Sequence, residues 1–328
     1  MTRFTTWAKL GPFVPLMAVL LVGAALNAQG AFFEWQTHRA VLREVSVGGI
    51  LACGMTVVIV SGGIDLAVGS LLGFSAVSFA WLTLSHGWPG LFAIPSVLAV
   101  GALLGALSGA LVAWPRLQPF IVTLAMMVFA RGLAKELSGG QKISTYVHLP
   151  DGRFESVPLP RVFEALDGRV LGGNVSAVTL VFLASALVTW LILERLRIGR
   201  YLFAVGGHFE AARLSGVPVR TTLLFAYVLS GVFAALAGIC QAAQETHGDP
   251  ETGLGYELDA IAMVVLGGTS LSGGRGGVHL TVIGALTLGY LQKVLSLNAY
   301  STELRLMLTG VILVLAAVFQ RRFGRLDL

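Results

Sequence analysis

The sequence predicts an all-α fold, a polytopic membrane helix bundle of about ten segments with short helices broken by glycine. Of the 328 residues, 55% are hydrophobic and only 12% are charged, and the mean hydropathy is +0.82. A soluble domain carries about 25% charged residues, so half that share leaves too little polar surface to face water. The apolar residues also occur in runs of about 20, the length of helix that crosses a ~30 Å hydrocarbon core. We therefore expect a single transmembrane domain over residues 1–328.

The apolar runs place each membrane segment in turn. The first resembles a signal peptide, but Leu26 stands where a small residue would precede cleavage at Ala28, so we expect a retained span. Segments 47–60 and 257–272 are short for a full crossing, because 14 residues of helix reach only about 21 Å. Both run into glycine pairs. The ten predicted segments are 11–29, 47–60, 66–86, 92–113, 119–137, 175–194, 222–243, 257–272, 278–296 and 303–320.

The charges between the segments give the bundle an orientation. Residues 195–220 are rich in arginine, and so is the C-terminus, whereas the loop at 244–256 is acidic and the loop at 141–172 is balanced. Lys and Arg gather on the cytoplasmic side of membrane proteins. We therefore expect 195–220 and both termini in the cytoplasm, with 141–172 and 244–256 facing out. This pattern accounts for the net charge of +5 without any nucleic-acid partner.

The titratable residues do not point to catalysis. The six histidines are scattered without the spacing of metal ligands. Cys53 and Cys240 each lie inside an apolar run, where we expect small buried hydrophobic residues and no disulfide. The sequence therefore predicts no catalytic residue, no metal site and no cofactor in this chain.

The end of segment 119–137 carries two features with more than one interpretation. Arg131 and Lys135 share a helix face, and we expect them to extend toward the outer interface; a polar lining at the outward mouth is the alternative. Leu137–Gln141 reads LSGGQ, the string with which ABC ATPases grip nucleotide. No lysine follows a glycine anywhere in the chain, so there is no phosphate-binding loop, and we interpret the string as a helix C-terminus.

Three longer strings resemble one family. They are SGGIDLAVGS at Ser61–Ser70, YLFAVGGHFEAARLSGV at Tyr201–Val217, and ELDAIAMVVLGGTSLSGG at Glu257–Gly274. In this order they are similar to the permease subunits of ribose-type ABC sugar importers, and the resemblance covers about residues 45–320. Within that family the chain looks most like the galactofuranose-type permeases. It departs from the family at His208, where Asn is common, and in a longer loop at about 144–172.

The resemblance implies a function and a set of partners. The chain would be the permease subunit of an ATP-driven, binding-protein-dependent importer of a monosaccharide, a pentose or hexose with galactofuranose as one candidate. It would lie in the bacterial inner membrane, in contact with membrane lipid. It would pair with a second permease chain, identical or related. A cytoplasmic ABC ATPase would use ATP and Mg²⁺, and a periplasmic sugar-binding protein would deliver the substrate.

The stretch 195–220 reads as a coupling loop. Glu210–Leu214 can form one or two helical turns, and Gly216 and Pro218 would end them. An ordinary positive-inside loop would explain the arginines alone. The resemblance implies that this turn is the coupling helix that touches the ATPase. The candidate coupling residues are Gly206, Gly207, Glu210, Ala211, Arg213, Leu214, Ser215 and Gly216.

The glycine-rich strings mark a candidate translocation path. Met55–Gly63 and Met263–Gly268 echo each other, and paired glycine-interrupted segments often line a transporter's substrate path. Asp65 is open to two interpretations. It can cap the helix that begins at residue 66, or it can contact sugar hydroxyls, since a carboxylate at membrane depth usually faces a partner or a cavity. The candidate path residues are Ser61, Gly62, Gly63, Asp65, Gly267, Gly268, Thr269, Ser272 and Gly273.

Other functions stay open at this point. A permease of the same family could import an autoinducer or a nucleoside instead of a sugar. A standalone secondary transporter would usually carry more ionisable groups inside the membrane for ion coupling. A membrane enzyme would need converging catalytic side chains, and the sequence shows no such arrangement.

Overall fold

The computed structural model describes residues 13–148 and 154–301, together with 303–305, 307, 308, 310 and 311. The elements are α2 (Phe13–Leu26), the short helix η1 (Ala28–Phe33), α3 (Trp35–Val60), α4 (Val68–Ala80) with the π turn η2 (Trp81–Ser85), α5 (Gly90–Ala113), α6 (Pro119–Ser138), β1 (Tyr146–His148), β2 (Phe154–Ser156), α7 (Arg161–Asp167), β3 (Arg169–Val170), β4 (Val175–Ser176), α8 (Ala177–Trp190) with the π turn η3 (Leu191–Arg195), α9 (Arg197–Gly207), α10 (Phe209–Leu214), α11 (Val219–Glu245), α12 (Tyr256–Leu266) and α13 (Val278–Leu297).

The helices confirm the predicted class of fold. Six described helices are long and apolar enough to cross a membrane, namely α3, α4 with η2, α5, α8 with η3, α11 and α13. Within the described residues, regular β structure is confined to two antiparallel pairs, β1 with β2 and β3 with β4. Cys53 and Cys240 are both buried and unpaired, as predicted.

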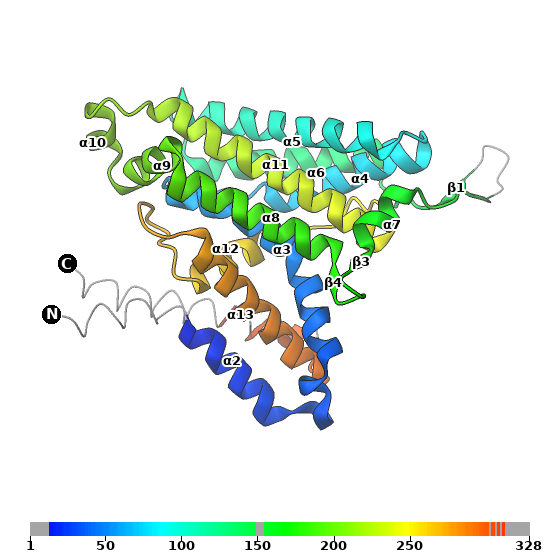
Figure 1. Ribbon diagram of the computed structural model, residues 1–328. Coiled ribbons are helices and arrows are strands. Elements are labelled where there is room, and N and C mark those ends of the chain that lie inside the picture. The colour runs from blue at the N-terminus through cyan, green and yellow to red at the C-terminus, as the bar shows by residue number, and fades with distance from the viewer. Residues whose placement is uncertain (1–12, 149–153, 302, 306, 309, 312–328) are drawn as a thin grey trace.

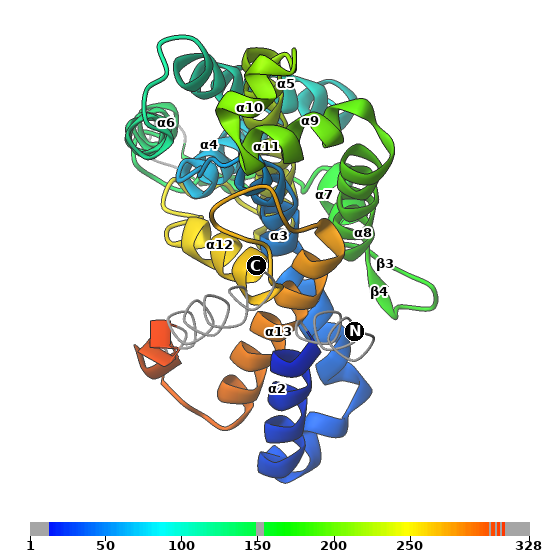
Figure 2. The same cartoon turned by 90° about the vertical axis from the view of Figure 1, so that its left-hand side faces the viewer.

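Helix α11 lies at the centre of the bundle and packs against α3, α4 and α5. Figure 1 shows α4, α5, α6, α8 and α11 running in roughly the same direction, with α9 and α10 at one end and α7 with the strands at the opposite end. Figure 2 views the bundle from the α9–α10 end and shows α2, α13 and the first half of α3 together on one side. The two ends can therefore carry different functions.

Helix α3 is longer than the predicted segment 47–60, and that prediction of a short segment is wrong. The helix has 26 residues, which is about 39 Å of length. Polar residues interrupt the apolar run before residue 47, but no proline breaks the helix there. They are satisfied by distant partners: Arg43 pairs with Asp167, Arg39 donates to the Gly173 carbonyl, and Lys293 pairs with Glu44 at 2.8 Å.

Helix α12 is short, as predicted, but it ends at Leu266 and the predicted end at residue 272 is wrong. Gly268 has φ +101°, a conformation that glycine adopts without strain. The chain then continues as a loop over 267–277 before α13 begins. The other described segments match within a few residues. For the predicted span 303–320, only the few positions named above are described.

Helices α5 and α11 approach each other through glycine. A methyl group on Gly105 would lie 2.3 Å from the Tyr227 carbonyl oxygen, and one on Gly231 would lie 2.2 Å from the Gly101 carbonyl oxygen. On Gly109 it would lie 3.0 Å from the Tyr227 side chain. Glycines four residues apart thus form a flat strip on α5, which is a common way for membrane helices to pack closely.

The segment 246–255 between α11 and α12 packs lengthwise along α4. A methyl group on Gly69 would lie 2.3 Å from the Gly253 carbonyl oxygen, and one on Gly73 would lie 2.5 Å from the Thr252 carbonyl oxygen. Irregular backbone is tolerated in a membrane bundle only where protein or water covers it. The glycines of α4 provide that cover here, so much of the predicted loop 244–256 is held against the bundle.

Candidate functional site

Three glycine pairs from distant parts of the chain meet beside the end of α3. Gly62–Gly63 follow α3, Gly206–Gly207 end α9, and Gly273–Gly274 lie in the loop between α12 and α13. The backbone N–H of Gly274 donates a hydrogen bond to the Val60 carbonyl at 3.0 Å. We call these six residues the glycine junction.

The junction is so tight that some of its positions exclude any side chain. A methyl group on Gly206 would lie 1.9 Å from the Val60 carbonyl oxygen and 2.8 Å from the Gly274 nitrogen. On Gly273, where φ is +80°, it would lie 2.7 Å from the Gly206 carbonyl oxygen. Gly207 differs, because a methyl group there would meet only the Gly274 Cα, at 3.9 Å. Gly206 and Gly273 are therefore required by backbone contact, and Gly207 is not.

The junction unites residues that the sequence assigns to two different roles. Gly62, Gly63 and Gly273 come from the candidate path, and Gly206 and Gly207 come from the candidate coupling set. All three strings that carry the family resemblance thus contribute to one contact. The sequence offered no signal for this contact, because its three glycine pairs are separated by more than 60 residues.

The remaining glycine-rich path residues lie away from the junction. Gly267 packs on α13, where a methyl group would lie 2.0 Å from the Leu280 carbonyl oxygen. Thr269 is buried, and its Oγ1 accepts the N–H of Gly277 at 3.4 Å. Ser272 is exposed. These three residues of the candidate path are therefore dispersed over the α12–α13 loop.

Asp65 is buried against α11, with 2% of its surface exposed. Its Oδ1 accepts the backbone N–H of Ala67 at 3.0 Å, and its Oδ2 accepts the Ser230 hydroxyl at 2.7 Å. The Tyr227 hydroxyl donates to the neighbouring Ile64 carbonyl at 3.3 Å. Both carboxylate oxygens are thus engaged within the protein, by the residue before α4 and by α11, which favours a structural role over contact with sugar. Sequence analysis missed Ser230 and Tyr227. The signal that could have indicated them was the presence of polar residues inside an apolar helix.

A small cavity of about 200 Å³ borders the junction on the side of α10. Its walls include Ser61, Gly62 and Tyr227, with Phe209 from the start of α10. The Arg116 guanidinium lies over the Phe209 ring, 5.5 Å from its centroid. This contact ties α10 to the turn between α5 and α6.

Helix α10 has a defined start and end. The His208 Nδ1 accepts the backbone N–H of Ala211 at 3.2 Å, so histidine performs here the capping role that asparagine often has. At the other end, the N–H of Gly216 donates to the Arg213 carbonyl at 3.1 Å, and Gly216 has φ +79°. The predicted helical turn that ends at Gly216 is confirmed.

The outer face of α10 is available to a partner. Arg213 and Glu210 form an exposed ion pair at 2.8 Å, and Leu214 is 80% exposed. Ala212 faces the bundle and is buried. The preceding helix α9 buries Leu202 against the end of α3. The loop therefore has one face packed into the bundle and another that is charged and exposed.

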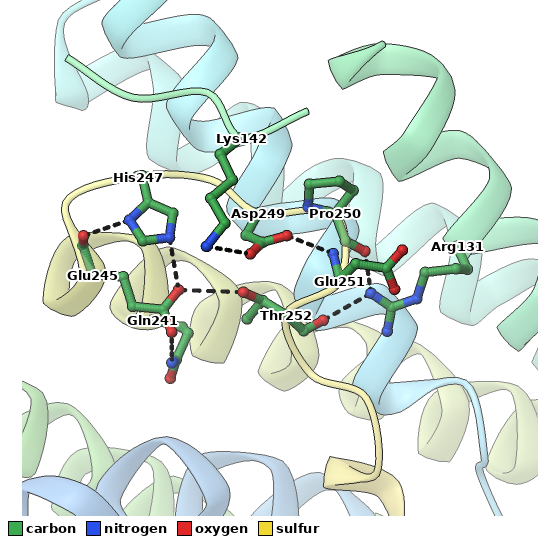
Figure 3. A network of polar contacts seen from close by, with 9 residues as sticks. All are labelled: Arg131, Lys142, Gln241, Glu245, His247, Asp249, Pro250, Glu251 and Thr252. Atoms are coloured by element: carbon green, nitrogen blue, oxygen red, sulfur yellow. Dashed lines mark hydrogen bonds and ion pairs between the residues drawn. The ribbon is translucent and has the colours of Figure 1, made fainter. Parts of the chain in front are cut away.

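A polar network at the opposite end holds the segment 246–255 to α6 (Figure 3). Arg131 donates to the carbonyls of Pro250 and Thr252, the latter at 2.8 Å. Lys135 pairs with Glu251 at 2.6 Å. Arg131 and Lys135 therefore bind this segment, and their extension toward the outer interface stays a prediction.

The same network reaches back to α11. The Gln241 amide donates to Glu245 at 2.7 Å, and the Thr252 hydroxyl donates to Glu245 at 3.2 Å (Figure 3). His247 lies beside the same carboxylate, with Nε2 3.7 Å from a Glu245 oxygen. The acidic residues of the predicted outward loop 244–256 are thus mostly bound by nearby donors.

Asp249 forms the outer edge of this network and pairs with Lys142 at 3.0 Å (Figure 3). Burial acts to raise the pKa of the Asp249 carboxyl, but the Glu251 backbone N–H and the Lys142 ammonium together outweigh it. They hold the pKa of Asp249 below its usual range.

The LSGGQ string ends α6, as predicted. The helix stops at Ser138, and Gly139 and Gly140 follow with φ +61° and +74°. The N–H of Gly140 donates to the Lys135 carbonyl at 2.8 Å, a bond typical of a glycine-ended helix. The string therefore has a full structural explanation at this position.

The long loop 141–172 is ordered around α7 where it is described. Phe163 of α7 is buried and stacks on Phe79 with ring centroids 5.0 Å apart. Asp167 pairs with Arg43 of α3. These contacts attach the loop to two helices of the bundle.

The described helices define a multi-pass membrane protein. Comparison with known proteins identifies the family: the permease component described for branched-chain amino acid transport systems matches residues 37–317. The ribose import permease of Escherichia coli strain K12 is 39% identical over 326 residues, 98% of this chain and 97% of the relative. The corresponding permease of Bacillus subtilis strain 168 is 36% identical over 318 residues, 96% and 93% of the two chains.

A hexose permease is also similar. The D-allose transport system permease of Escherichia coli strain K12 is 30% identical over 323 residues, 97% of this chain and 93% of the relative. No solved structure matches significantly. The chain belongs to the family of ribose-type ABC importer permeases, which are multi-pass proteins of the bacterial inner membrane.

Proposed function

We propose that this chain is the membrane-spanning permease subunit of an ATP-driven importer of a monosaccharide, a pentose or a hexose. The observation that carries the proposal is similarity over nearly the whole chain to relatives named for ribose and for D-allose. These sugars differ in size, so the family relationship supports the class of substrate and leaves galactofuranose as a candidate within it.

The charges support an orientation for the bundle. The α9–α10 end carries the arginines of 195–220, and the opposite end carries the acidic segment 244–256. By the positive-inside rule, α9 and α10 face the cytoplasm and α7 faces the periplasm. Both termini are then cytoplasmic.

The partners follow from this orientation. A cytoplasmic ABC ATPase, which holds ATP and Mg²⁺, binds the exposed face of α10 formed by Glu210, Arg213 and Leu214. A periplasmic sugar-binding protein delivers substrate at the α7 end. A second permease chain, identical or related, completes the path between them, and membrane lipid surrounds the pair.

Reconstitution tests the proposal directly. Proteoliposomes that contain the permease, its ATPase and its binding protein should take up labelled ribose or a hexose only when ATP is supplied. Omitting either partner should abolish uptake. Uptake by the permease alone would show that the chain is a secondary transporter and would overturn the proposal.

A charge swap tests the assignment of α10. Arg213→Glu breaks the ion pair with Glu210, and we expect loss of the ATP hydrolysis that loaded binding protein stimulates. The double variant Glu210→Arg with Arg213→Glu restores the pair but reverses the surface that the ATPase meets. Loss in both variants supports a contact with the partner. Recovery in the double variant would show that only the stability of α10 matters.

A further inference from the structure

We propose that the glycine junction is a rigid connector through which displacement of α9 and α10 moves the end of α3 and the loop 267–277 together. This inference rests on the proposed function, because it assumes that a partner displaces α10. It adds the route by which that displacement enters the bundle.

The contact between the three segments is made by backbone atoms. The Gly206 Cα sits so close to the Val60 carbonyl that a methyl group would fall 1.9 Å from its oxygen, and the Gly274 N–H bonds that same oxygen at 3.0 Å. Side chains can change rotamer and absorb a small displacement. A contact between backbones has no such freedom, so movement of one segment is passed to the others.

The segments on both sides of the junction are themselves held firmly. Within the loop 267–277, the Ser270 N–H donates to the Arg275 carbonyl at 3.0 Å, and the buried Thr269 packs against Gly276. On the other side, α9 ends at Gly207 and α10 begins two residues later. Neither side therefore offers a flexible linker in which a displacement would be lost.

From the junction the connection continues into the bundle. Val60 is the last residue of α3, and the chain runs from it to Asp65 within five residues. Asp65 is bonded to Ala67 at the start of α4 and to Ser230 of α11. The end of α3 thus joins the coupling loop to the two helices at the centre of the molecule.

Two glycines provide a pair of variants, one inside the junction and one outside it. Gly206→Ala must push the backbones apart, whereas Gly132→Ala in α6 places its methyl group within 4 Å of no described atom. In reconstituted complexes we expect Gly206→Ala to lower the number of sugar molecules imported per ATP hydrolysed at least tenfold. Gly132→Ala should stay within twofold of wild type. A normal ratio for Gly206→Ala would overturn the proposal.

Distance measurements keep the test valid if Gly206→Ala fails to assemble. Spin labels on Ala204→Cys in α9 and Leu271→Cys in the loop occupy exposed positions, while Cys53 and Cys240 are buried. The distance between the labels should stay constant between the nucleotide-free and ATP-bound complexes.

A second label pair provides the reference for that measurement. The distance from Leu271→Cys to Leu91→Cys, at the exposed start of α5 beside α7, should change between the same two states. If both distances stay constant, or if the distance from Ala204→Cys changes as much as the reference, the rigid connection is refuted. If wild type shows no ATP-driven uptake, the proposed function fails first, independently of the junction.

Discussion

Removing the carboxylate of Asp65 should destabilise the protein strongly, whereas converting it to an amide should not. Asp65→Ala leaves the buried N–H of Ala67 and the hydroxyl of Ser230 without their acceptor. Each unsatisfied buried group costs about 1–3 kcal/mol, so the expected loss is about 2–6 kcal/mol. In Asp65→Asn the amide oxygen can still accept from Ala67, and the amide nitrogen can donate to Ser230. The expected loss there is about 1 kcal/mol.

Unfolding in detergent, followed by intrinsic fluorescence, measures these differences, and uptake in proteoliposomes measures function. Ser230→Ala supplies the control, because the double variant with Asp65→Ala removes both partners at once. The double variant should lose less unfolding free energy than the sum of the two single variants, by about 0.5–3 kcal/mol. Asp65→Asn should retain near-normal uptake.

Two results would refute this reasoning. Wild-type stability for Asp65→Ala would show that its two hydrogen bonds do not hold the start of α4. Loss of uptake in Asp65→Asn at unchanged stability would show that the negative charge itself acts in transport.

Three further predictions concern helix packing and the polar network around the segment 246–255. Gly105→Ala should destabilise the α5–α11 contact by about 1–3 kcal/mol, seen as a lower unfolding midpoint. Gly132→Ala should not lower the midpoint, because a methyl group there meets no described atom within 4 Å. Equal midpoints for the two variants would contradict the glycine packing. Arg131→Gln should speed amide hydrogen exchange in residues 249–256, because two carbonyls lose their donor, and unchanged exchange would show that Arg131 does not hold the segment. Lys142→Gln should lower the midpoint by a constant amount from pH 5 to 8, and the difference should shrink only below about pH 4, as Asp249 protonates through its lowered pKa. A difference that persists at pH 2 would argue against that ion pair.

Composition and apolar run length were sufficient to predict the class of fold, because membrane crossing is a property of each segment alone. The predicted start of α3 at residue 47 was wrong because it depends on contacts with other segments. Arg43 and Glu44 interrupt the apolar run, and only their distant partners, Asp167 and Lys293, show why a helix can continue through them. Such partners belong to the folded molecule and leave no pattern in the local sequence.

The candidate site was predicted in its parts but not in its assembly. The glycines of the three strings were identified as unusual, and the helical turn of α10 follows from its own residues. That Gly206 contacts Val60 and Gly274 is a tertiary fact, which spacing along the chain does not encode. The partner Ser230 was missed because nothing in the local sequence of its helix indicates which side chain faces Asp65.

The irregular segment 248–253 along α4 has a consequence for the order in which the protein is made. It has turns in place of a continuous helix, so it could not enter the lipid alone without exposing unsatisfied backbone groups. The segment contacts the glycine face of α4 and the guanidinium of Arg131, and both emerge from the ribosome more than 100 residues earlier. Synthesis from the N-terminus therefore produces these packing partners before the segment that packs against them. A circular permutant that reverses this order should insert poorly even though its final contacts are the same.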